Sequence, residues 1–135
     1  GGIIYAGLAI YDTMQSVNAP ISTIAVGATA SMATLLLAAG TKGRRYALPN
    51  ATVHMHPAGG GVQGYAPDVE IQARELLRMQ SKIQEILSRH TGQARERIAA
   101  DFDRDYYMDA QGAVEYGIVD EIITPRNKAL TPEGA

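Results

Sequence analysis

The chain has 135 residues, with 12 Lys+Arg against 14 Asp+Glu and a formal net charge of −2, a size that fits one domain whose core needs no disulfide or metal. The absence of cysteine excludes disulfide scaffolds, cysteine-ligated zinc, iron–sulfur clusters and thiol catalysis. The near-neutral charge argues against a nucleic-acid partner, and no apolar run reaches the roughly 18 residues of a membrane span, so no membrane partner is expected. A cysteine-free composition is consistent with a reducing compartment.

Hydrophobic periodicity divides the first half of the chain into helices and strands. Apolar side chains at three- and four-residue spacing predict a helix over residues 4–17. The β-branched run 21–26 predicts a buried strand, and the Ala- and Leu-rich run 32–39 predicts a buried helix. Short strands are also expected at 45–48 and 52–56.

One long helix dominates the second half. An apolar stripe predicts it over residues 67–90, about 36 Å long at a rise of about 1.5 Å per residue. Shorter helices are predicted at 94–100 and 110–116, the latter capped by Asp109, and a closing strand at 118–123. Strands that alternate with helices indicate an α/β layered fold.

A serine stands where the strand 21–26 leads into the helix 32–39. The hydroxyl of Ser31 is expected near free helix N–H groups, where the helix dipole would stabilise a developing oxyanion. The simpler interpretation is an N-cap serine. Position alone leaves both interpretations open.

Two histidines flank Met55 on the strand 52–56, so their side chains share a face. Three interpretations of His54 and His56 are open. They could be a metal-binding pair, a catalytic base with a structural neighbour, or two polar residues on an exposed face. No third ligand follows at a strong metal-binding spacing, so no metal is expected. The catalytic interpretation requires a serine and a carboxylate to converge on one imidazole.

An acidic cluster lies between the two short helices. It contains Asp101, Asp103, Arg104 and Asp105. One interpretation is a solvated ion-pair network. The other is that one of the three carboxylates orients an imidazole. Serine, histidine and aspartate then follow in that chain order.

Two glycine clusters have open interpretations as well. Gly1-Gly2 either exposes backbone N–H groups toward an anion or is a flexible end. Gly59, Gly60 and Gly61 form either a plain loop or an open backbone edge that pairs with an extended peptide.

Several consecutive motifs resemble the ClpP family of self-compartmentalised serine peptidases, without gaps from Gly1 to about Ile123. They are Gly1-Gly2-Ile3-Ile4-Tyr5-Ala6-Gly7, Ile10-Tyr11-Asp12-Thr13-Met14, Ala30-Ser31-Met32, Leu37-Ala38-Ala39-Gly40-Thr41-Lys42-Gly43-Arg44-Arg45-Tyr46-Ala47-Leu48-Pro49-Asn50, His90-Thr91-Gly92-Gln93, Asp103-Arg104-Asp105-Tyr106-Tyr107-Met108 and Glu115-Tyr116-Gly117-Ile118-Val119-Asp120. The resemblance implies a ClpP/crotonase-like layered β-β-α superhelix with helix 67–90 as a protruding handle. Residues 1–124 would be a peptidase domain lacking its N-terminal part, followed by a polar tail at 125–135.

The resemblance also assigns roles in a serine endopeptidase. Ser31 would be the nucleophile, His56 the general base and Asp105 the residue that orients His56. Backbone N–H groups of Gly2 and Met32 would form the oxyanion hole, and no metal or cofactor is implied.

Further implied roles concern substrate and assembly. The substrate strand would pair with backbone at Ile3, Ile4, Gly59, Gly60 and Gly61, while Asp103 and Arg104 would contact a second ring. Two stacked seven-membered rings would enclose a chamber in the cytoplasm, where an AAA+ ATPase such as ClpX, ClpA or ClpC feeds unfolded protein. A second apolar face on the handle, including Ile71 and Met79, is the expected ring-to-ring surface.

Three regions differ from the usual family pattern: the entry to the nucleophile, the strand with His54 and His56, and the N-terminus. The nucleophile follows Gly27-Ala28-Thr29-Ala30 rather than Gly-Gln-Ala-Ala, and His56-Pro57-Ala58 stands in place of His-Gln-Pro. His54 replaces a usually apolar residue, where it would compete with His56 for a proton or a metal. The third is the part missing before Gly1. The alternatives are a non-catalytic subunit of such a ring and, more remotely, a crotonase-fold enzyme acting on acyl-CoA.

Overall fold

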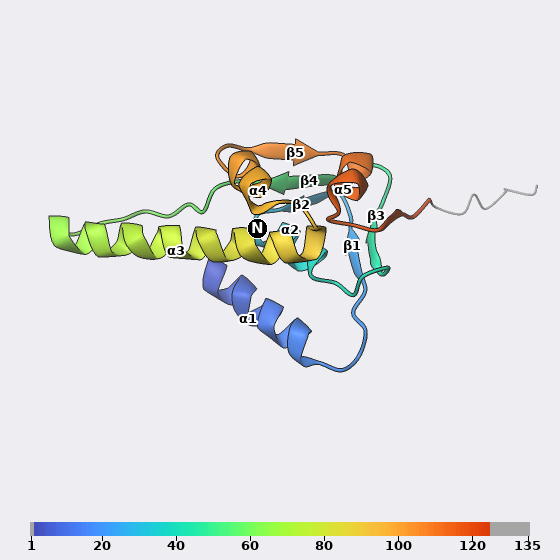
Figure 1. The fold of residues 1–135 in the computed structure, drawn as a ribbon, viewed down its shortest axis with the longest axis horizontal. Coiled ribbons are helices and arrows are strands. Elements are labelled where there is room, and N and C mark those ends of the chain that lie inside the picture. The colour runs from blue at the N-terminus through green and yellow to red at the C-terminus, as the bar shows by residue number, and fades with distance from the viewer. Residues whose placement is uncertain (1, 125–135) are drawn as a thin grey trace, which may run out of the picture.

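Two three-stranded sheets form the body of the computed structural model, which describes residues 2–124 (Figure 1). The predicted tail 125–135 lies outside these residues. The first sheet has the order β1 (Thr23–Ala25), β3 (Arg45–Ala47), β6 (Glu121–Ile122), and both of its pairings are parallel. The second has the order β2 (Ala28–Ala30), β4 (Thr52–Met55), β5 (Tyr106–Met108), with β2 parallel and β5 antiparallel to β4. The described part is thus a layered α/β fold, as predicted.

The chain passes from one sheet to the other between β1 and β2. Gly27 makes this passage with a φ of 67°, in the left-handed region that glycine adopts without strain. Neither β2 nor β5 was predicted from sequence, because each is three residues long and is a strand through its pairing with β4.

The helices lie close to their predicted positions. Their bounds are α1 (Ile4–Ser16), α2 (Met32–Ala38), α3 (Ala66–Thr91), α4 (Arg95–Asp101) and α5 (Ala110–Tyr116). Asp109 caps α5 by accepting a hydrogen bond of 2.7 Å from the N–H of Gly112, and Gly117 ends it with a φ of 90°. The predicted cap and stop of this helix are therefore confirmed. Within residues 2–124, none of the helices combines the length and the apolarity needed to cross a membrane.

The long helix α3 lies on the body with its C-terminal half and extends beyond it with its N-terminal half (Figure 1). Ile71 on the extended half is 66% exposed. Met79, which was expected on the same outward face, is 6% exposed and packs inside the chain. The prediction for Met79 was wrong because the side of α3 that continues from Met79 through Ile83 and Leu87 faces the body.

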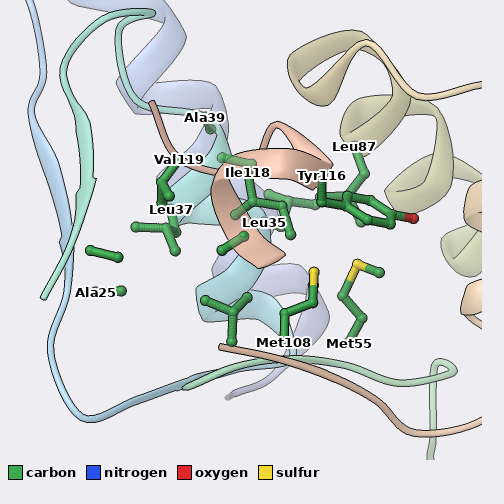
Figure 2. Close-up of a cluster of buried hydrophobic side chains, with 14 of the residues drawn as sticks. Ala25, Leu35, Leu37, Ala39, Met55, Leu87, Met108, Tyr116, Ile118 and Val119 are labelled. Carbon is green, nitrogen blue, oxygen red and sulfur yellow. The ribbon is translucent and has the colours of Figure 1, made fainter. Parts of the chain in front are cut away.

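The core lies between the sheets, α2 and α5. Figure 2 shows the side chains of Met55 and Met108, from neighbouring strands, directed toward the same buried cluster as Leu35 and Tyr116. The strand predicted at 21–26 is shorter and less buried than expected: Ala25 is fully buried, whereas Ile24 is 51% exposed. This follows from the period of two along a strand at the edge of its sheet.

Candidate active site

Ser31 occupies a strained turn between β2 and α2. Its φ of 59° and ψ of −126° make it the one non-glycine residue with positive φ in the described part of the chain. Such a conformation costs about 1–3 kcal/mol and is found where the surrounding structure enforces it. Here the N–H of Ser31 donates to the carbonyl of His54 over 3.0 Å, and the hydroxyl of Thr34 donates to the same carbonyl over 2.8 Å.

The Ser31 hydroxyl is not used for capping. Ser31 is the N-cap residue of α2, yet its side chain makes no capping hydrogen bond. The structure thus does not support the simple N-cap interpretation of this serine. A hydroxyl at a strained strand-to-helix turn, left free of the helix, is the arrangement expected of a nucleophile.

A cavity of about 100 Å³ brings several predicted site residues together. Ser31 and His56 both line it, as do Gly2 and Met32. Met32 is the first residue of α2, so its N–H has no acceptor within the helix and remains available to an oxyanion. The remaining lining residues are Ile4, Pro57, Ala58, Gly59, Ile83 and Phe102.

The imidazole of His56 is fixed in one tautomer. Its Nδ1 lies 2.7 Å from the carbonyl oxygen of Pro57, and because that oxygen only accepts, Nδ1 carries the proton. The other nitrogen, Nε2, is then the basic one, as a general base toward a serine hydroxyl requires. The next residue is held as well: the N–H of Ala58 donates to Oε1 of Gln80 on α3 over 3.0 Å.

The carboxylate of Asp105 binds His54 and not the predicted His56. Its Oδ1 lies 3.1 Å from Nε2 of His54, whose ring stacks on Tyr107 with ring centroids 4.1 Å apart and planes 3° apart. The side chain of His54 is 17% exposed and that of Asp105 is 65% exposed. Asp105 is not among the residues that line the cavity.

Of the predicted substrate-binding residues, Ile4 and Gly59 line the cavity. Gly59, Gly60 and Gly61 are exposed in the loop that follows β4, outside any strand. Ile3 is extended, with φ −69° and ψ 130°, whereas Ile4 already begins α1. Extended backbone on this side therefore ends at Ile3.

The predicted ring-contact residues Asp103 and Arg104 are exposed on the turn before β5, where the guanidinium of Arg104 donates to the carbonyl of Asp103 over 2.9 Å. Within residues 2–124, the histidine and carboxylate side chains form no cluster of three or more with the geometry of a metal site.

An exposed cluster ties the first turn of α1 to α3. The hydroxyl of Tyr5 donates to Oε1 of Glu75 over 3.0 Å, and Nε of Arg78 donates to Oε2 over 2.7 Å. These hydrogen bonds, first that from Arg78 and then that from Tyr5, lower the pKa of Glu75 to about 2. The hydrogen bond to Glu75 raises the pKa of Tyr5. The cluster thereby joins α1, which begins two residues after Gly2, to α3.

Two positioning residues were missed from the sequence. Gln80 holds Ala58 across 22 residues of chain, and Thr34 holds the carbonyl of His54 across 20. Neither contact has a local sequence signal.

Comparison with known proteins identifies the family. The family model described as Clp protease matches residues 1–126. Two relatives from Dehalococcoides mccartyi, strains BAV1 and CBDB1, are named ATP-dependent Clp protease proteolytic subunit. Each is 62% identical over 129 residues, which cover 95% of this chain and 64% of the relative. The chain thus spans less than two thirds of the length of these relatives. With its layered α/β fold, this chain belongs to the Clp protease family.

Proposed function

We propose that the chain is the catalytic part of a serine endopeptidase subunit, with Ser31 as nucleophile and His56 as general base. The observation that carries the proposal is the Ser31 turn. The residue is strained, its hydroxyl is not bonded to the helix, and it shares a cavity with an imidazole whose Nε2 is basic.

The reaction follows from these positions. Ser31 attacks the peptide carbonyl while Nε2 of His56 accepts its proton, then returns that proton to the leaving amine, and water releases the acyl-enzyme. The N–H groups of Met32 and Gly2 would stabilise the oxyanion, each by about 3–4 kcal/mol in the transition state. Asp105 would support the imidazolium when its carboxylate reaches His56.

The substrate is best described as extended polypeptide. The exposed backbone at Gly59, Gly60 and Gly61, with Gly2 lining the same cavity as Gly59, offers main-chain pairing that requires few particular side chains. Unfolded protein fits this mode, since its backbone N–H and C=O groups are free.

The proposed assembly is two stacked seven-membered rings in the cytoplasm, served by an AAA+ ATPase such as ClpX, ClpA or ClpC. Its support is the name of the relatives, ATP-dependent Clp protease proteolytic subunit, together with the extended half of α3, which carries the exposed Ile71 and Leu77. Asp103 and Arg104 are exposed and available for a ring contact.

Labelling with a fluorophosphonate, followed by mass mapping of the adduct, tests the proposal. The adduct is expected on Ser31, with loss in Ser31→Ala and at least a hundredfold slower labelling in His56→Ala. Ser22→Ala is the matched control, because Ser22 is exposed and outside the cavity. Equal labelling of the wild type and His56→Ala would reject His56 as the base.

A non-catalytic ring subunit is the second candidate, and one observation favours it: Asp105 is bonded to His54 rather than to His56. An assembled particle in which Ser31 takes no label while a catalytic relative does so in parallel would support this alternative.

A further inference from the structure

Asp105 has two imidazoles within its range. In the antiparallel register of β4 and β5, Met55 pairs with Tyr106 and His54 pairs with Tyr107. His56 and Asp105 are the next residues beyond these strands, and extending the register by one residue would set them across from each other, with His54 as the diagonal neighbour of Asp105. Directly opposed residues have Cβ atoms about 4.5–5.5 Å apart and diagonal neighbours lie about 7–8 Å apart, which long polar side chains still span.

The two rings share one face of the chain and lie close together. The ring centroids of His54 and His56 are 5.3 Å apart, with planes inclined by 36°. The Asp105 side chain is 65% exposed, so rotation about its side-chain bonds meets little packing. A rotamer change is therefore enough to move its carboxylate from one ring toward the other.

In the observed arrangement each ring has a different partner. His54 holds the carboxylate, and its stack on Tyr107 keeps the ring in place. His56 has the Pro57 carbonyl on its Nδ1. A neutral carbonyl sets the same tautomer as a carboxylate but stabilises the imidazolium less, because a charge-assisted hydrogen bond is roughly twice as strong as a neutral one.

From this geometry we infer that His54 is a positioning residue that holds Asp105 away from His56, so that the site rests in a less reactive form and gains reactivity when the carboxylate transfers to His56. The inference rests on the proposed peptidase function of Ser31 and His56. Reactivity then scales with the fraction of molecules whose Asp105 lies on His56.

Removing the competing ring is expected to raise reactivity. In His54→Leu, the rate of fluorophosphonate labelling at Ser31 should rise by about tenfold, which corresponds to ~1.4 kcal/mol. His54→Gln keeps a side-chain donor for Asp105, so its rate should stay within about twofold of the wild type. Thr52→Val is the control, since Thr52 is exposed on the same face of β4. A purely structural role for His54 predicts loss of labelling rather than gain.

A double-mutant cycle with Asp105→Asn tests the route. In the wild-type background this change should slow labelling by a smaller factor than in the His54→Leu background, because the carboxylate lies on His54 in the observed arrangement. In the His54→Leu background it should remove the gain. Circular dichroism and thermal unfolding of each variant establish that the fold persists, and His54→Gln supplies the comparison if the leucine variant is destabilised.

The outcomes separate the two claims. If Asp105→Asn alone slows labelling as much as His56→Ala does, or if His54→Leu labels no faster than wild type, the role of His54 is overturned while the peptidase proposal stands. If Ser31 takes no label in any variant, the peptidase proposal fails, and the role of His54 fails with it.

Discussion

Replacing Asp120 by Asn tests the interaction that fixes the far end of α2. Oδ2 of Asp120 accepts hydrogen bonds from the N–H of Gly43 (2.7 Å) and from the N–H and Nε of Arg45 (3.1 and 2.9 Å), while Oδ1 accepts one from Nη2 of Arg45 (2.6 Å). Nη1 of Arg45 donates to the carbonyls of Ala38 and His90, so one guanidinium joins α2, α3 and the first sheet.

The expected cost of Asp120→Asn follows from the number of donors. The side-chain oxygen of the asparagine can accept from the three donors that Oδ2 of Asp120 now accepts from. Its NH₂ group then faces Nη2 of Arg45, and because both groups are donors, no hydrogen bond forms between them. One charge-assisted bond is lost, worth about 1.5–3 kcal/mol, and the Arg45 side chain, 4% exposed, loses its counter-charge. We expect a loss of about 3 kcal/mol, at the lower end of the range for breaking a buried pair because Asp120 is 19% exposed.

Urea unfolding followed by circular dichroism measures the free energy of unfolding. Glu121→Gln is the matched control, because Glu121 is the neighbouring exposed carboxylate and should change stability by less than about 0.5 kcal/mol. A loss below about 1 kcal/mol in Asp120→Asn at pH 7 would refute the reasoning.

Acid provides a second measurement on the same group. The hydrogen bonds from Arg45 hold the pKa of Asp120 below its usual value, despite the opposing effect of burial. A carboxyl group whose pKa is lowered on folding stabilises the fold above its unfolded pKa, about 3.9, and loses that contribution as the pH falls through the folded pKa. The difference in unfolding free energy between wild type and Asp120→Asn should therefore be constant from pH 5 to 7 and shrink below about pH 4. A difference that grows in acid would contradict this assignment.

Three glycine substitutions test close packing. Gly117→Ala should destabilise the protein by at least about 3 kcal/mol in the same urea assay, because the new Cβ would lie 2.3 Å from the backbone oxygen of Thr91. Gly92 has a similar positive φ, but a Cβ there would have no atom within 4 Å, so Gly92→Ala should cost about 1–2 kcal/mol. Equal losses would show that φ rather than contact decides the cost. Gly7→Ala places a Cβ 3.0 Å from Cβ of Met32. We expect the start of α2 to shift and the labelling of Ser31 to fall several-fold. Unchanged labelling would show that the Met32 side chain moves aside without a shift of its backbone.

Local sequence determined much of the fold. The apolar stripe predicted α3 to within a residue at each end, and Asp109 and Gly117 predicted the limits of α5. These predictions succeeded because helix periodicity and capping depend on neighbours within one or two turns. The family motifs likewise pointed to Ser31 and His56, which line one cavity in the structure.

Only the tertiary structure decided which residues meet across the sheets. Strands β2 and β5 are three residues each and exist through long-range pairing with β4, which short propensity signals do not encode. The choice of His54 over His56 as the partner of Asp105 is of the same kind. Both histidines share a face of the chain, so the period of a strand cannot separate them, and the positions of side chains across two neighbouring strands select the partner.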